Sequence, residues 1–228
     1  MPSIIDNCEA KGIRYLGLTD HLSIYTDPSI FQRENRKISN SNSNIKVYLG
    51  VEVDILDIGK HAMHEDVLEN VDYVIAASNH YWKPEVNSPS DGTLHSIGKH
   101  ILDMFEYACS LDFADFVAHP MVIMQNMYDS TCLDLLTDKE LEKAIRVAVE
   151  NNTAVEISPR ALAPSQRYFL VRFYSICKNM GVKFAIGSDG HNLKDAGRTD
   201  ILGSLIKEIG IENDDIWLPE VHGKNLNK

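Results

Sequence analysis

Residues 184–191 read FAIGSDGH, an apolar, strand-like run that ends in Asp189 and His191. Gly187 and Gly190 flank the turn, and glycine lets a backbone turn sharply and approach a ligand closely. A carboxylate and an imidazole therefore follow directly after a predicted buried strand. Both groups are common metal ligands, so this stretch predicts a strand end that carries chemistry.

The same arrangement recurs in five other segments, each of them apolar and each ending in His, Asp or Glu. In a parallel α/β barrel, the carboxyl ends of the strands point at one mouth, where active sites lie. Imidazoles and carboxylates gathered there suit divalent transition metals. The segments are LGLTDH (16–21, with Asp20 and His21), YLGVEVD (48–54, with Glu52), YVIAASNH (73–80, with His80), FVAHP (116–120, with His119) and TAVEIS (153–158, with Glu156).

Helical patterns separate these strands, which is typical of parallel α/β folds. Residues 94–111 place apolar side chains at helical spacing, and Thr137 with Glu140 forms a capping box at the start of residues 137–150. We expect one α/β barrel domain over residues 1–228. Helices are also expected at 2–11, 65–70, 165–180 and about 199–209, and strands at 13–19, 45–53, 72–78, 115–118, 153–157 and 182–186.

Two polar stretches are expected to lack regular elements. Residues 25–44 read as a loop with at most a short helix, and residues 211–228 read as a polar tail. Trp217 and Leu218 are the apolar residues of that tail that could dock on the barrel.

Composition restricts the class of protein. The chain has 44% hydrophobic and 24% charged residues, which is ordinary for a globular protein. No apolar run approaches the roughly 18 residues that span a bilayer, and the N-terminus lacks the pattern of a secretory signal. We therefore expect a cytoplasmic protein without a membrane partner. The four cysteines are widely spaced and predict buried free thiols.

The formal net charge of −11 disfavours binding to nucleic acid, which depends on clustered Lys and Arg. It does not exclude a small phosphorylated substrate, because one or two arginines can hold a phosphate. Arg160, directly after the strand end of Glu156, is the first candidate for that role. Arg198 and Lys83 are the second and third, and each of the three could instead be a solvated surface charge.

Single residues in this set are weak evidence. His21, His80 and His119 could each be a histidine of the core. Glu52 lies in an apolar strand, and a buried carboxylate needs a cation nearby, either a basic side chain or a metal. Pro120 should hold His119 in an extended conformation.

Taken in order, TDH, GVEVD, SNH, AHP, EIS and GSDGH resemble the motifs of the PHP (polymerase and histidinol phosphatase) family. The resemblance runs from about residue 2 to about residue 210. It implies a distorted, TIM-like (β/α)7 barrel that holds up to three divalent metal ions, commonly Zn, Mn or Fe. It also implies hydrolysis of a small phosphomonoester, histidinol phosphate being one option, by two-metal chemistry.

The resemblance assigns the metal ligands residue by residue. Glu52 matches a carboxylate that bridges two metals, and His80 and His119 match the histidines that join it at one of them. Asp189 matches the carboxylate on the other bridged metal. Histidines of the remaining metal correspond to His21 and His191. Proton transfer would fall to Asp20 or Glu156, the latter at a position usually near the site and not a firm ligand.

One departure from the family pattern is serious. The family opens with a strand that ends in HxH, and no HxH occurs in this sequence. His61 and His64 are spaced as HxxH and are expected to be solvated loop histidines. By the family pattern, only the site of Glu52, His80 and His119 is complete.

Two explanations compete for the missing strand. Met1 could be an internal methionine of a longer protein, which we favour because the remaining ligand set is intact, or the chain could have lost activity. An open barrel would expose the edges of strands 13–19 and 182–186 and invite association, which leaves an oligomer open.

Function is therefore expected to be that of a metal-dependent phosphoesterase, impaired in this chain. The alternative is a degenerate barrel that keeps one metal and binds a metabolite or a protein. A nuclease-like module beside a polymerase and a general amidohydrolase are further readings, disfavoured by the acidic charge and by the lack of a strand-end lysine.

Overall fold

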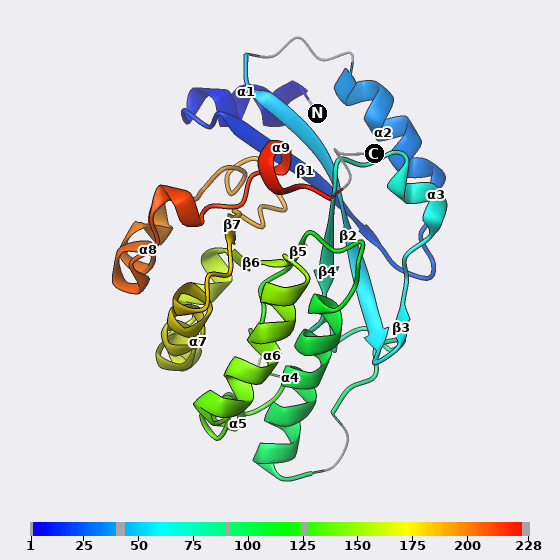
Figure 1. The fold of residues 1–228 in the computed structure, drawn as a ribbon. Helices are drawn as coiled ribbons and strands as arrows, with labels where there is room; N and C mark the ends of the chain where they lie inside the picture. The colour runs from blue at the N-terminus through cyan, green and yellow to red at the C-terminus, as the bar shows by residue number, and fades with distance from the viewer. Residues whose placement is uncertain (1, 40–43, 90–91, 125–126, 225–228) are drawn as a thin grey trace.

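Six parallel strands form an open half-barrel in the computed structural model, which describes residues 2–39, 44–89, 92–124 and 127–224 (Figure 1). Their order in the sheet is β1-β2-β4-β5-β6-β7, and the short strand β3 pairs antiparallel with β2. Each strand thus lies beside its neighbour in the sequence, as in a barrel. The strands are β1 Tyr15–Leu22, β2 Lys46–Asp57, β3 Lys60–His61, β4 Tyr73–Ala77, β5 Phe116–Val117, β6 Ala154–Ile157 and β7 Phe184–Ile186.

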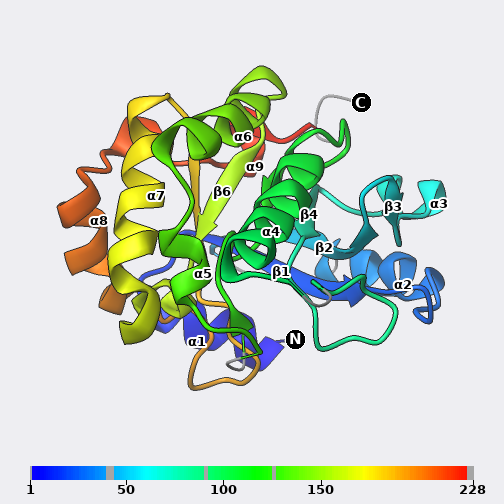
Figure 2. The same cartoon turned by 90° about the horizontal axis from the view of Figure 1, so that it is seen from below.

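Helices α4, α6 and α7 cover the outer face of the sheet, as both views show (Figures 1 and 2). Helix α6 begins with the expected capping box of Thr137 and Glu140. The α-helices are α1 Pro2–Ala10, α2 Ser29–Ser39, α3 Glu65–Leu68, α4 Leu94–Cys109, α5 Thr131–Asp134, α6 Asp138–Glu150, α7 Arg167–Asn179, α8 Gly203–Ile209 and α9 Pro219–His222. Short 3-10 turns occupy Pro159–Leu162, Pro164–Gln166, Asp200–Leu202 and Asn213–Asp215.

The largest apolar core lies between the sheet and these helices. Phe105 of α4 meets Phe173 of α7 edge to face, with 5.3 Å between the ring centroids. Val117 and Val155 reach this layer from β5 and β6. Burying a side chain of this size contributes about 1.5–3 kcal/mol, so this layer is a main source of the sheet's stability.

The inner face of the half-barrel is also filled, by a cluster centred on Tyr73. Its ring stacks on Phe116 and meets the ring of Trp217. A Cβ atom on Gly50 would collide with the Tyr73 ring, so glycine at this position makes the close approach possible. The expectation that Trp217 docks on the barrel is confirmed, since it is buried and its backbone N–H donates to Phe184 O at 2.8 Å.

Strands β1 and β7 are the two ends of this sheet. The described residues include no strand beside β1 opposite β2, and only a single bridge from Ile216 reaches the outer side of β7. A cavity of about 730 Å³ lies between the two strands and extends from the strand ends to Trp217. The expected open barrel, with exposed strand edges, is therefore observed.

The sequence placed most elements correctly but underestimated two of them. Helix α2 has 11 residues where a loop was expected, because Phe31 is fully buried and Ile30 and Ile38 pack beside it. Strand β2 runs four residues beyond its expected end at Val53 and turns back through β3. His61 lies in β3 against Phe113 and is therefore not a solvated loop residue.

Two further expectations can be compared with the structure. All four cysteines are buried and free, as predicted. Among the described residues, no helix combines the length and the apolar character needed to cross a membrane.

Candidate metal centre at the strand ends

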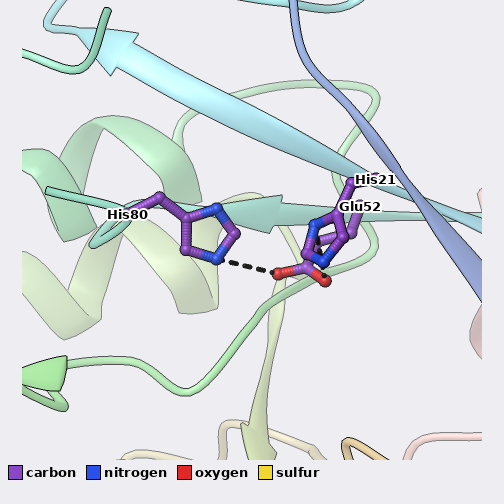
Figure 3. A group of neighbouring side chains, drawn as sticks. All are labelled: His21, Glu52 and His80. Carbon is purple, nitrogen blue, oxygen red and sulfur yellow. Dashed lines mark ion pairs between the residues drawn. The ribbon is translucent and has the colours of Figure 1, made fainter. Parts of the chain in front are cut away.

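Glu52 is the centre of the candidate site. It lies on β2, and its Oε1 atom is 3.3 Å from His80 Nε2 and 3.4 Å from His119 Nε2. The other oxygen, Oε2, is 3.5 Å from His21 Nδ1. His80 and His21 therefore reach different oxygens of one carboxylate (Figure 3). This is the geometry expected of a carboxylate that could serve two neighbouring cations.

The parallel sheet brings these residues together. His21 of β1 pairs in register with Glu52 of β2, so the two side chains emerge side by side. His80 and His119 follow the next strands, β4 and β5, and their rings lie 5.4 Å apart. The expectation that successive strand ends share one mouth holds for these four residues.

His80 is fixed on its other nitrogen as well. Its Nδ1 atom lies 2.7 Å from Oδ1 of Asp54, which is fully buried. Lys83 Nζ donates to both oxygens of the same carboxylate, at 2.8 and 2.6 Å. The amine predicted to bind phosphate is thus engaged with Asp54.

His119 and Asp189 both have left-handed backbone, with φ of 29° and 46°. The expectation that Pro120 holds His119 extended was wrong. A buried hydrogen bond outweighs the preference, because the His119 N–H donates to Glu156 Oε2 at 2.8 Å. Such backbone costs about 1–3 kcal/mol per residue and concentrates at functional sites.

Asp189 and His191 form a second, more open group. The Arg160 guanidinium is in contact with Asp189 through a hydrogen-bonded ion pair. His191 Nδ1 lies 3.6 Å from Asp189 Oδ1, and the His191 ring centroid is 6.2 Å from that of His21. His21 therefore stands between the two groups and is a neighbour of both.

Burial and neighbouring charge shift the protonation of the central groups. Burial alone would raise the pKa of Glu52, but the imidazoles of His119 and His80 outweigh it and hold that pKa well below its usual value. Burial would lower the pKa of His80, yet Asp54 and Glu52 outweigh it and raise that pKa. The pKa of His21 is lowered, chiefly by burial.

The pKa of Glu156 is shifted upward, in the opposite direction to that of Glu52. Burial raises its pKa to about 8, the N–H of His119 lowers it in part, and the carboxylates of Asp189 and Glu52 add to the rise. The carboxyl group leaves no room beside it, since a Cβ on Gly187 would lie 2.5 Å from Glu156 Oε1. Near neutral pH this side chain therefore carries a proton.

The donor set fits a divalent metal ion. His21, Glu52 and His80 each offer one ligand atom, and these atoms all lie within 4.8 Å of one another. Glu52 Oε1 is buried and faces two imidazole nitrogens without a well-formed hydrogen bond in the described part of the chain, so it lies where a cation would bind. Imidazole and carboxylate together suit Zn, Mn or Fe.

Several known proteins resemble this chain in sequence. The chain is 25% identical over 211 residues to a "Probable phosphatase" of Caldicellulosiruptor bescii, which covers 91% of this chain and 80% of that protein. It is 26% identical over 221 residues to a "Probable phosphatase" of Vibrio atlanticus, covering 92% and 80%. It also matches "DNA polymerase/3'-5' exonuclease PolX" of Bacillus subtilis, at 25% identity over 82% of this chain and 30% of that protein.

A solved structure shares the fold. It is that of hisK from Listeria monocytogenes, a proposed histidinol phosphatase, with a TM-score of 0.65 at 14% identity over 86% of this chain and 91% of that one. These relatives and this shared fold support the resemblance to the PHP family that the sequence motifs indicate. No protein-family model matches this sequence.

The mouth of the half-barrel holds most of the predicted site residues around the cavity. Asp20 lines it, together with His21, Glu52, His119, Glu156, Asp189 and His191. His80 lies behind Glu52 and does not line it. The three predicted phosphate-binding cations do not line it either, and each has an acidic partner: Arg160 on Asp189, Arg198 on Asp195 and Lys83 on Asp54.

Sequence reasoning missed one residue of this candidate site, Asp54. The signal was present, because Asp54 follows Glu52 by two positions, and residues two apart in a strand share a face. Such a second carboxylate on one face of an apolar strand predicts a further partner for the histidines around Glu52.

Proposed function

We propose that this protein is a metal-dependent phosphatase that hydrolyses a small phosphomonoester, as a histidinol phosphatase would. The observation that carries the proposal is the carboxylate of Glu52, approached by three imidazoles in a buried mouth. The relatives named probable phosphatases are consistent with it. The charge of −11 favours a small phosphorylated metabolite over nucleic acid as the substrate.

Glu52, His80 and His119 would hold one divalent ion, and His21 and His191 would contribute to a second position. A metal bound here supplies Lewis-acid activation of phosphate and lowers the pKa of a water molecule. The protein's own part is to fix these side chains before substrate arrives. His80 and His119 are buried, so their rings have little freedom to turn away.

Proton transfer to the leaving alkoxide would fall to Glu156. Its Oε2 accepts the N–H of His119, which leaves Oε1, beside Gly187 on the cavity wall, to carry the proton. Asp20 lines the same cavity and is the second candidate. Being near the strand end of β1, it is more exposed than Glu156.

Arg160 would bind the substrate phosphate, since a guanidinium matches phosphate with two parallel hydrogen bonds. It would have to exchange Asp189 for the phosphate, or contact both. Arg198 and Lys83 are weaker candidates because their partners, Asp195 and Asp54, do not line the cavity, whereas Asp189 does.

We further propose that turnover is slow, because the two groups are unequally built. Asp189 has Arg160, His191 and no other imidazole within ion-pair distance among the described residues. The same pairing favours a second candidate function, a barrel that keeps one metal and binds a metabolite without hydrolysing it. In that case Arg160 takes the place of a cation at Asp189.

Removal and return of metal tests the proposal. The protein would be stripped with a chelator, reloaded with Zn or Mn, and assayed for phosphate release from histidinol phosphate and p-nitrophenyl phosphate. We expect activity that depends on metal and that Glu52→Gln abolishes. Glu150→Gln on an exposed helix end is the matched control. Metal binding without any phosphate release would favour the binding barrel instead.

A further inference from the structure

Asp54 is a fully buried carboxylate that touches neither the cavity nor any other predicted ligand except His80. It lies two residues after Glu52 on β2, so the same strand presents two carboxylates on one side. These carboxylates take the two nitrogens of one imidazole. His80 Nδ1 is 2.7 Å from Asp54, and His80 Nε2 is 3.3 Å from Glu52.

The contact with Asp54 determines how the His80 ring is used. A carboxylate can only accept hydrogen bonds, so the proton of the hydrogen bond must belong to His80 Nδ1. In the neutral ring, Nε2 then carries the lone pair and faces Glu52 Oε1. The two atoms lie 3.3 Å apart, close enough to share one cation, either a proton or a metal ion.

Lys83 completes the arrangement from the other side. Its ammonium donates to both oxygens of Asp54 and balances the charge of a carboxylate that has no access to solvent. A buried carboxylate without such a partner would be costly. The backbone supports the contact, because Lys83 N–H donates to His80 O at 2.9 Å and so closes a turn between the two residues.

We propose that Asp54 and Lys83 form a positioning pair for the metal centre. Asp54 orients the ring of His80 by accepting the hydrogen bond of Nδ1, and Lys83 holds Asp54 in place through two hydrogen bonds. Neither residue of the pair lines the cavity. It acts through His80 and rests on the proposed metal-dependent function only in so far as His80 is a ligand.

Metal affinity is the first measurement. Asp54→Asn keeps the shape of the side chain but removes its charge, and we expect it to weaken binding of the first Zn ion by about 10–100-fold, as removal of an outer-shell partner does. Asp57→Asn, three residues further along the same strand, is the matched control and should bind Zn like the wild type. Titration against a competing chelator measures both without an activity assay.

A double-mutant cycle separates positioning from general stability. Because Lys83 acts through Asp54, Lys83→Met should weaken Zn binding in the wild type and change it little in the Asp54→Asn background. Equal losses in both backgrounds would mean that Lys83 acts elsewhere, and would remove it from the pair.

The wild-type protein provides the direct test, which does not depend on whether a variant folds. Nitrogen NMR of the ¹⁵N-histidine-labelled, Zn-loaded chain should show His80 with the proton on Nδ1 and metal on Nε2. A proton on Nε2 would overturn the proposal. If phosphate release fails but this tautomer and the loss of affinity are found, the positioning pair stands and the phosphatase proposal does not.

Discussion

The two halves of the candidate site differ in how far the fold has prepared them. His80 and His119 expose only 1% and 4% of their side chains and converge on Glu52. His191 exposes 60%, and its neighbour Asp189 is held by Arg160. The first half is buried before any ligand arrives, whereas the second has a partly exposed arginine as its cation. A site assembled on the middle strands of a sheet is thus better defined than one at its edge.

The largest expected effect compares one histidine from each half. His80→Ala should abolish binding of the first Zn ion, because the variant loses a buried ligand and leaves Asp54 without its imidazole partner. His191→Ala should leave that ion in place, because His191 lies at the edge of the site. Elemental mass spectrometry of the purified, reloaded variants gives the number of ions per chain. Equal losses in the two variants would show that the halves are not distinct.

The next effect concerns pH and the metal-free protein. The folded pKa of Glu156, about 8, lies above the ordinary value of 4.5. As pH rises, Glu156 loses its proton in the unfolded chain at a lower pH than in the folded chain. The free energy of unfolding should therefore fall between about pH 4.5 and about pH 8, by roughly a few kcal/mol. Glu156→Gln cannot ionise, so its melting temperature should fall less over this range. Melting temperatures are measured in a chelating buffer. An equal fall with pH in the wild type and in the variant would refute the raised pKa of Glu156.

The smallest of the three effects tests Arg160. Arg160→Ala should raise KM for a phosphomonoester by about tenfold or more, because a charge-assisted hydrogen bond contributes about 1.5–3 kcal/mol. Arg198→Ala, whose partner Asp195 lies outside the cavity, is the comparison. An unchanged KM in the Arg160 variant would mean that this arginine serves only Asp189.

Sequence alone predicted the six parallel strands and the set of strand-end residues, because alternating apolar runs and terminal polar residues are local features. It missed helix α2, since only the buried contacts of Phe31 reveal why a polar stretch folds. The sequence also predicted an extended backbone at His119, which is left-handed in the structure. The hydrogen bond from His119 to Glu156 joins residues 37 apart, and no local rule for the residue before proline accounts for it.

The side-chain partners were the hardest part to anticipate. The sequence offered Arg160, Lys83 and Arg198 either as phosphate-binding candidates or as solvated surface charges, and the structure gives each an acidic neighbour. Such pairings depend on distance in space and not on spacing in the sequence. Asp54 is a different case, because its position two residues after Glu52 was a usable signal, and only its partner His80, which follows another strand, had to come from the structure.

The chain has only two tryptophans, and the fold places them at opposite ends of the half-barrel. The ring of Trp82 lies 4.5 Å from that of His80, while Trp217 is buried against Tyr73 and Phe116 at the other end of the cavity. Fluorescence of the first is sensitive to the charge of the neighbouring imidazole, and fluorescence of the second to the packing of the inner core. The molecule thus carries two optical reporters, one for ligand capture and one for the integrity of the barrel.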